Sequence, residues 1–305
     1  QGTKAYTLVI DGGNAALAQQ ADYNGDGQSD FALWSNTGTW RLSLSNGGAN
    51  RQAQTQSWGT AGDVSLLGDY DGDGKTDLAV FRPANGTWYV KRSSDGGSLV
   101  KAWGAATDVP VPGDYDGDGQ TDIAVFRPSE GHWYVLRSAD QQYQVTAWGA
   151  GYAPYNDVAV PGDYDGDGKT DLAVFRRGFS QGGTWLVRRS SDGQFMAKAW
   201  GLATDVPVAA DYDGDGKTDI AVWRGGTWYV WQSASNSYRV TEWGANYAPY
   251  FDQATPGDYD GDGKADVAVW RPATGTWFAI RSTDGSFLVQ AHGQSGDTSL
   301  PSKQW

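Results

Sequence analysis

The nine-residue run DYDGDGKTD, which occupies residues 69–77, places carboxylates where a hard cation could use them. Asp69, Asp71, Asp73 and Asp77 stand at its positions 1, 3, 5 and 9, and a glycine at position 6 permits a sharp turn. Calcium takes about six to eight oxygen ligands, so we expect the backbone carbonyl of Lys75 to complete the set. Four carboxylates this close would repel one another without a cation. The run therefore predicts a Ca²⁺ site.

An EF-hand and an unfilled turn are the alternatives to this interpretation. An EF-hand needs a glutamate at position 12 and a helix after the loop, whereas position 12 here is Val80, within an apolar run. A turn rich in aspartate can also be stabilised by its own backbone without a metal. Because the run recurs with its acids kept, the metal site is the stronger interpretation.

Copies of the run start at residues 22, 69, 114, 163, 211 and 258, at intervals of 45 to 49 residues. Each interval contains four short segments rich in β-branched and aromatic residues, for example 77–82, 87–93, 98–104 and 108–115, separated by turn sequences. No segment has helical periodicity. Four strands per repeat predict an all-β fold, a β-propeller of four-stranded antiparallel blades with calcium loops between the first and second strands.

We expect a single propeller domain over residues 1–305, with six blades. The blades are expected at about residues 14–58, 59–104, 105–149, 150–201, 202–244 and 245–293, with closure strands at 1–13 and 294–305. Residues 5–12 resemble a fourth strand, and residues 297–305 resemble the start of a first strand. We favour closure by the N-terminal strand beside the last blade. A seventh blade, which would lack two of its strands, is the alternative.

The acidic copies resemble the FG-GAP/VCBS repeat family, which includes the integrin α-subunit propeller and a fungal propeller lectin. The resemblance covers nearly the whole chain and implies about six Ca²⁺ ions, each held between two strands of a blade. The further ligands that it implies are Asp114, Asp116, Asp118, Gln120, Asp122, Asp163, Asp165, Asp167, Lys169, Asp171, Asp211, Asp213, Asp215, Lys217, Asp219, Asp258, Asp260, Asp262, Lys264 and Asp266. The first copy offers Asp22, Asn24, Asp26, Gln28 and Asp30. Its asparagine replaces an acid, which predicts weaker binding there.

The composition excludes several classes of protein and site. A net charge of −13 argues against binding nucleic acid, and the longest apolar runs are too short for membrane insertion. The chain has no cysteine and only two histidines, which excludes disulfides and Cys/His zinc sites. The loops contain 23 of the 36 acidic residues, so the acidity is mostly a metal requirement. We expect a secreted, extracellular protein in which metal replaces disulfides as a stabiliser.

The remaining acids give little support for catalysis. Six of them open the first strands, at Asp63, Asp108, Asp157, Asp205, Asp252 and Asp297, and residues repeated in every blade indicate scaffold. A glycosidase needs a dedicated carboxylate pair across one pocket. No nucleophile motif accompanies either histidine. We therefore expect no enzymatic activity, and a polysaccharide-active enzyme is the third alternative.

Three groups recur on the face opposite the acidic loops. Arginine ends the second strand at 82, 127, 176, 224 and 271, and tryptophan opens the third strand at 40, 88, 133, 185, 228 and 277. Tryptophan also ends the fourth strand at 58, 103, 148, 200 and 243, with His292 in the sixth place. We interpret these tryptophans as packing between blades, and we expect each arginine to stack on them or to pair with the aspartate that opens the first strand.

Three insertions on that same face break the repeat. Residues 149–157 and 244–252 both insert Tyr-Ala-Pro-Tyr after a blade, and residues 176–185 lengthen a turn. Exposed rings beside polar groups suit carbohydrate. The candidate ligand-binding residues are Trp148, Tyr152, Tyr155, Phe179, Trp243, Tyr247 and Tyr250. Loops that merely cover the blade edges are the alternative.

These patterns predict a calcium-stabilised binding module whose partner is a glycan or another cell-surface ligand. The first hypothesis is a lectin-like carbohydrate-binding protein. The second is an adhesion or surface-assembly protein that recognises proteins. The sequence does not indicate the sugar or the oligomeric state.

Overall fold

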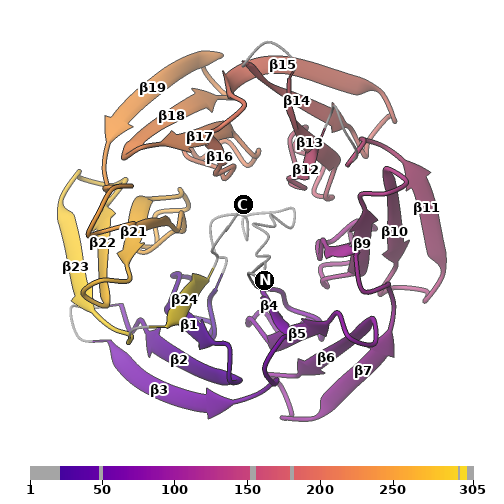
Figure 1. Ribbon diagram of the computed structural model, residues 1–305, viewed down its shortest axis with the longest axis horizontal. Helices are drawn as coiled ribbons and strands as arrows, with labels where there is room; N and C mark the ends of the chain where they lie inside the picture. Colours follow the sequence, from indigo (N-terminus) through magenta and orange to yellow (C-terminus); the bar gives the residue numbers. More distant parts are fainter. Residues whose placement is uncertain (1–20, 48–50, 152–155, 179–181, 295, 301–305) are drawn as a thin grey trace.

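The computed structural model describes residues 21–47, 51–151, 156–178, 182–294 and 296–300. They form six four-stranded antiparallel sheets arranged as blades in a ring (Figure 1). The protein is thus a six-bladed β-propeller, which confirms the predicted fold class and blade number. The part of the chain described here contains no helix long and apolar enough to cross a membrane.

Each blade runs from an inner strand at the central axis to an outer strand at the rim. Blade 1 contains β24 (Asp297–Leu300), β1 (Phe31–Ser35), β2 (Thr39–Leu44) and β3 (Gln52–Ser57), and blade 2 contains β4 (Val64–Leu66), β5 (Leu78–Arg82), β6 (Thr87–Lys91) and β7 (Ser98–Ala102). Blade 3 contains β8 (Val109–Pro110), β9 (Ile123–Arg127), β10 (His132–Leu136) and β11 (Tyr143–Ala147), and blade 4 contains β12 (Val158–Ala159), β13 (Leu172–Arg177), β14 (Gly182–Arg188) and β15 (Phe195–Leu202). Blade 5 contains β16 (Val206–Pro207), β17 (Ile220–Arg224), β18 (Thr227–Gln232) and β19 (Ser237–Glu242), and blade 6 contains β20 (Gln253–Ala254), β21 (Val267–Arg271), β22 (Thr276–Ile280) and β23 (Phe287–Ala291).

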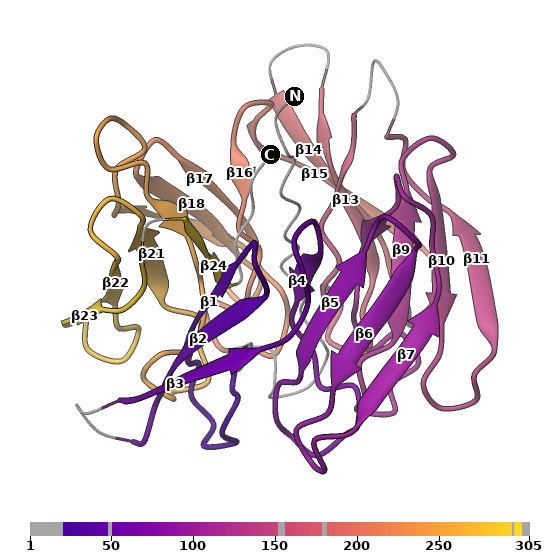
Figure 2. The same cartoon turned by 60° about the horizontal axis from the view of Figure 1, so that its bottom comes forward.

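Burial falls from the axis outward within each blade. In blade 2, β5 is buried at four of its five residues, whereas the outer strand β7 alternates between exposed and half-buried residues. Figure 2 shows β5, β6 and β7 side by side in this order. A strand covered on both faces is expected to be continuously apolar, as residues 78–81 (LAVF) of β5 are. The pattern of apolar and polar residues in each strand therefore follows from the distance of that strand to the axis.

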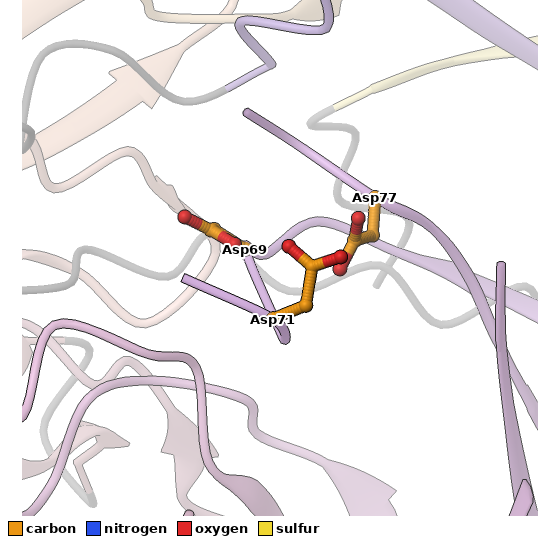
Figure 3. A group of neighbouring side chains, drawn as sticks. All are labelled: Asp69, Asp71 and Asp77. Atoms are coloured by element: carbon orange, nitrogen blue, oxygen red, sulfur yellow. The ribbon is translucent and has the colours of Figure 1, made fainter. Parts of the chain in front are cut away.

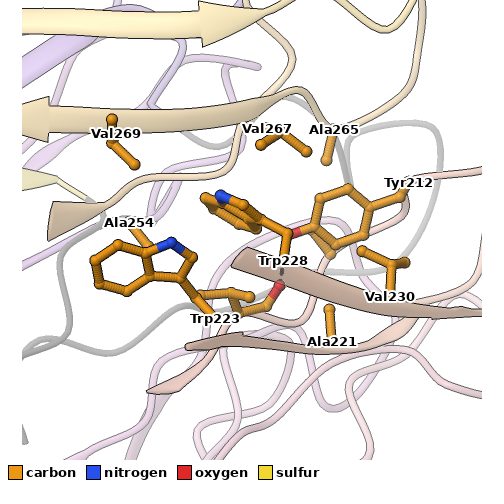
Figure 4. Close-up of a cluster of buried hydrophobic side chains, with 11 residues drawn as sticks. Tyr212, Ala221, Trp223, Trp228, Val230, Ala254, Ala265, Val267 and Val269 are labelled. Atoms are coloured by element: carbon orange, nitrogen blue, oxygen red, sulfur yellow. Dashed lines mark hydrogen bonds between the residues drawn. The ribbon is translucent and has the colours of Figure 1, made fainter. Parts of the chain in front are cut away.

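The hydrophobic core lies between neighbouring blades. The tryptophan that opens each third strand is fully buried, as Trp228 illustrates. Figure 4 shows Trp228 and Trp223 of blade 5 packed against Val267 and Val269 of blade 6. The tryptophan at the end of a fourth strand also spans the seam, by which we mean the interface between two neighbouring blades. Its indole N–H donates to the next blade. Trp103, for example, donates to the carbonyl oxygen of Tyr134 at 3.1 Å. The interpretation of both tryptophan sets as packing devices is confirmed.

The ring closes through the C-terminal segment. The inner strand of blade 1 is β24, which pairs with β1 from Ala32↔Leu300 to Ser35↔Asp297. The expected boundary of 14–58 for blade 1 therefore omits its inner strand, since residues 297–300 occupy that place. Pairing a strand from the chain's end with one near its start holds the first and last blades together by backbone hydrogen bonds. The expected N-terminal closure strand at residues 5–12 lies outside the described residues.

The propeller has two distinct faces. The metal-loop face carries the six acidic loops and the turns between third and fourth strands. A hydrogen bond joins a loop to such a turn in blade 2, where Ser93 Oγ donates to Asp73 Oδ1 at 2.9 Å. The connection face carries the turns between second and third strands and the links between blades. On this face, the backbone N–H of Trp103, at the end of a fourth strand, donates to the carbonyl oxygen of Gly86, in a turn between second and third strands, at 2.8 Å. This arrangement agrees with the two faces expected from the strand directions.

Candidate metal centre

The second acidic loop shows how the sequence folds locally. Both oxygens of Asp69 accept backbone N–H groups, from Gly72 at 2.7 Å and from Gly74 at 2.8 Å. These two glycines have φ of +78° and +83°, a conformation that other residues adopt only at a cost. Asp77 accepts from the Tyr70 N–H at 2.8 Å, which ties the end of the loop to its start. The chain thus curls around its own carboxylates.

Carboxylates gather inside five of the six loops. In each group, one oxygen per aspartate lies within 4.8 Å of the others. Positions 1, 3 and 9 meet in loops 2, 3 and 5, and positions 1, 3 and 5 meet in loops 4 and 6. Figure 3 shows the carboxylates of Asp71 and Asp77 turned toward one another in loop 2. Among the described residues, the first loop forms no such group.

Unpartnered oxygens test whether these groups fit a cation. Asp71 Oδ1, Asp213 Oδ1 and Asp260 Oδ1 are buried and have no hydrogen-bond partner. All three stand at position 3 of a loop. A buried, unpaired carboxylate oxygen is costly, and a hard divalent cation is the partner that such oxygens prefer. The residues present therefore fit a metal ion of the calcium type.

Burial makes the loop carboxylates costly to ionise in the absence of a cation. It raises the pKa of Asp77 to about 6 and that of Asp122 to about 7, against the opposing effect of backbone hydrogen bonds. Burial and then the neighbouring carboxylates also raise the pKa of Asp69. A bound divalent cation would favour the ionised forms.

The six loops form one continuous ring. In each seam, the backbone N–H of position 8 donates to the position 1 carbonyl of the preceding loop, at 2.6 to 2.7 Å. The donor and acceptor pairs are Thr76 and Asp22, Thr121 and Asp69, Thr170 and Asp114, Thr218 and Asp163, Ala265 and Asp211, and Ser29 and Asp258. The last pair links loop 1 to loop 6, so the ring is closed.

Hydroxyl groups that sequence reasoning did not single out support the carboxylates. Ser94 Oγ donates to Asp71 Oδ2 at 2.6 Å, and Ser93 Oγ donates to Asp73. Equivalent bonds run from Ser191 to Asp165 and from Thr283 to Asp260. The signal was available, because a serine follows the third strand in every blade. These bonds hold the position 3 and position 5 side chains toward the loop interior.

The expected aspartate–arginine pairs are all present on the connection face. Each arginine that ends a second strand makes two hydrogen bonds to the aspartate that opens the first strand. The pairs are Arg82–Asp63, Arg127–Asp108, Arg176–Asp157, Arg224–Asp205 and Arg271–Asp252, at 2.7 to 2.8 Å. In blade 1, Ser35 takes the arginine's place and Asp297 pairs with Arg41 of the third strand at 2.8 Å. Four of these arginines stack on a tyrosine or phenylalanine rather than on the expected tryptophan, namely Arg82, Arg127, Arg224 and Arg271.

The candidate ligand residues occupy different kinds of place. Trp148 and Trp243 lie in seams, where their indole N–H groups donate to the carbonyls of Leu186 and Phe278. Tyr247 is 60 % exposed. Tyr250 is partly buried and covers the Arg271 guanidinium, whose carbon lies 4.3 Å from the ring centre. The other three candidates, Tyr152, Tyr155 and Phe179, lie outside the described residues.

Two grooves also open between blades on the metal-loop face. One, of about 300 Å³, lies between blades 2 and 3 and includes Arg92 and Lys101. The other, of about 330 Å³, lies between blades 3 and 4 and includes Lys169 and Arg188. Each groove is formed by residues from two repeats, so the pattern within one repeat does not predict it.

Comparison with known proteins supports the repeat architecture. The family model described as FG-GAP-like repeat matches five overlapping segments, residues 22–80, 69–125, 114–174, 163–222 and 211–269. None of the curated protein sequences matches the chain significantly.

Among solved structures, similar folds occur at low sequence identity. A lectin of Agrocybe aegerita, described as recognising non-reducing terminal N-acetylglucosamine, is 18 % identical with a TM-score of 0.56, over 89 % of this chain and 78 % of that one. A chain of the nidogen/laminin complex is 12 % identical with a TM-score of 0.56, over 89 % and 96 %. AofleA of Arthrobotrys oligospora is 10 % identical with a TM-score of 0.53, over 96 % and 97 %.

Proposed function

This chain belongs to the FG-GAP-like repeat family, and we propose that it is a secreted, calcium-stabilised propeller that binds carbohydrate. The metal part of the proposal depends on the gathered carboxylates and on the unpartnered oxygens at position 3. When bound, calcium would supply the positive charge that these buried carboxylates lack. The residues that would hold it are the predicted aspartates, with the carbonyl at position 7.

The carbohydrate part of the proposal depends on one observation above all. Tyr247 presents an exposed ring on a loop that interrupts an otherwise regular repeat. Its neighbour Tyr250 is held by Arg271, and the two tyrosine rings meet edge to face at 5.8 Å. A fixed aromatic platform of this kind stacks on the C–H face of a sugar at little entropic cost. The Agrocybe aegerita lectin gives the fold a precedent for sugar binding.

A glycan array probed with the calcium-loaded protein tests the proposal. N-Acetylglucosamine-terminated glycans are the first class to examine, given the similar lectin. The variant carrying both Tyr152→Ala and Tyr247→Ala should lose all glycan binding while its melting temperature stays within a few degrees. If this variant still bound glycans, the sugar site would lie elsewhere on the protein. Arg92 and Arg188, which line the two grooves, would then be the next residues to mutate. No binding to any glycan would reject a lectin.

A protein partner is the second candidate. The similarity in fold to a chain of the nidogen/laminin complex favours it, since that structure is a complex between proteins. Capture of a defined extracellular matrix protein, together with an empty glycan array, would support this candidate. We propose no enzymatic activity, because the acids outside the metal loops are mostly engaged in ion pairs on the blades.

A further inference from the structure

The first acidic loop differs from the others in how its position 3 side chain is used. Asn24 donates from Nδ2 to the Ser45 carbonyl at 2.6 Å, and its Oδ1 accepts the Asp26 N–H at 2.9 Å. The equivalent Asp71 leaves one oxygen buried and unpartnered. Loop 1 therefore satisfies with protein hydrogen bonds the position that loops 2, 5 and 6 leave with an unpartnered oxygen.

A buried arginine stands beside the first loop. The Arg51 side chain is only 6 % exposed, and its Nη1 lies 4.0 Å from Oδ1 of the fully buried Asp30, the position 9 carboxylate. Nη1 also donates to the carbonyls of Ser29 and Ser43, both at 3.2 Å. A guanidinium keeps its charge at all ordinary pH values, so a positive charge always stands beside Asp30.

Arg51 also bridges the seam at which the ring closes. Its Nη2 donates across to the Tyr259 carbonyl of blade 6 at 3.4 Å, and its guanidinium carbon lies 4.1 Å above the Phe31 ring. Phe31 in turn stacks on Trp277 of blade 6, with ring centres 4.7 Å apart. The Arg51 side chain thus contacts blade 1, blade 6 and the first acidic loop.

No other blade carries a cation at this position. The strand registers align Arg51 with the last residue of the turn between third and fourth strands, which is Gly96, Gln141, Gly193, Asn236 or Gly285 elsewhere. Each of these five has a positive φ between 51° and 72°. The arginine is therefore specific to the blade whose loop has lost an acid.

We propose that loop 1 is not a divalent-cation site, and that the Arg51 guanidinium takes the place of the metal there and clamps blade 6 to blade 1. The protein then binds five ions rather than the expected six, a statement that depends on the proposed calcium binding of loops 2 to 6. The clamp acts at the one blade assembled from both ends of the chain. The closing seam thereby stays joined when calcium is scarce.

Ion counting on the full-length protein tests this proposal. Equilibrium dialysis with elemental analysis should give five calcium ions per chain. Asp73→Ala, in loop 2, should reduce the count to four, whereas Asp26→Ala, at the same position of loop 1, should leave five. Six ions in the unmodified protein, or a loss caused by Asp26→Ala, would overturn the proposal. A count of zero would instead reject calcium binding as a whole, so the two failures are distinguishable.

Two further variants examine the arginine itself. Arg51→Met should lower the melting temperature by several degrees, and by the same amount with calcium as with EDTA, because the clamp contains no metal. Arg239→Met, at an exposed site on β19, is the matched control and should change neither value. Combining Asn24→Asp with Arg51→Gln restores the loop's acid and removes its cation, and should raise the count to six. A count still at five in a folded double variant would contradict the assigned role of Arg51.

Discussion

The two faces of the propeller differ in how closely their six repeats agree. On the metal-loop face, the nine-residue loops are nearly identical from loop 2 to loop 6. On the connection face, the links between blades vary in length and carry two of the insertions, and the third insertion lengthens the turn between the second and third strands of blade 4. The closed ring of hydrogen bonds explains the difference, because each loop must fit the loops on both sides of it. The links on the other face meet no such requirement and are free to diverge.

The fit between neighbouring loops is tight at four seams, and a pair of alanines replaces the usual residues at a fifth, whereas at the sixth Ala21 stands opposite Thr76. At four seams, the residue before the loop is glycine and faces a threonine or serine of the next loop. A Cβ atom added to Gly113 would lie 2.8 Å from Thr170 Oγ1, which is too close. Blade 5 has Ala210 at the glycine's position, and the residue that faces it across the seam is Ala265. The extra methyl group on one side is matched by a smaller side chain on the other.

Removal of calcium should have the largest effect, because it acts on the whole metal-loop face. Each filled loop adds about 2.7 kcal/mol when the free ion is at ~100 times its dissociation constant. We expect the melting temperature to fall by more than about 10 °C in excess EDTA, since several loops lose their ion together. Calorimetry with elemental analysis of the treated protein measures this. An unchanged melt after proven metal loss would show that the two faces do not differ in metal dependence.

The ion pairs allow a second comparison of the faces. Arg127→Ala on the connection face removes the cation from Asp108, whose side chain is fully buried, and should cost about 3–5 kcal/mol. Arg92→Ala on the metal-loop face breaks the pair with Asp95, of which 56 % is exposed, and should cost about 0–1 kcal/mol. Urea unfolding of both variants in calcium gives the two values. Equal losses would mean that burial does not decide the strength of these pairs.

The sequence predicted most of what the repeats share. Five nearly identical loops and recurring tryptophans defined the blades, the metal-loop face and the Arg127–Asp108 type of pair, because each of these lies within one repeat or recurs in all. It identified residues 297–305 as the start of a first strand but did not place that strand in blade 1, and it did not predict the clamp formed by Arg51. The placement of that strand and the clamp both depend on contacts between segments far apart in the chain. Likewise, Tyr247 and Tyr250 look equivalent in sequence, and only the fold of their loop separates them.

A test of the loop-to-loop fit should give a smaller effect than the buried ion pair. Gly113→Ala places a methyl group against Thr170 and should cost about 1–3 kcal/mol through overpacking. Adding Thr170→Ala reproduces the arrangement of Ala210 and Ala265 and should recover most of the loss. A double variant no more stable than the single one would show that the alanine pair in blade 5 is not a compensation.

The smallest change in stability is expected in the inserted loop of residues 244–252, on the connection face. Tyr250→Ala uncovers Arg271 and should cost about 1 kcal/mol, the usual size of a partly exposed cation–π contact. Tyr247→Ala removes a ring that is mostly in solvent and should change stability by less than about 0.5 kcal/mol. The same substitution should nevertheless weaken glycan binding more than Tyr250→Ala does, because the exposed ring is the one that a sugar can reach. Thermal melts and titration of the best glycan from the array, run on both variants, measure the two effects separately. If Tyr247→Ala destabilises the protein and leaves binding intact, the inserted loop serves the scaffold, and the connection face diverges for a reason other than ligand recognition.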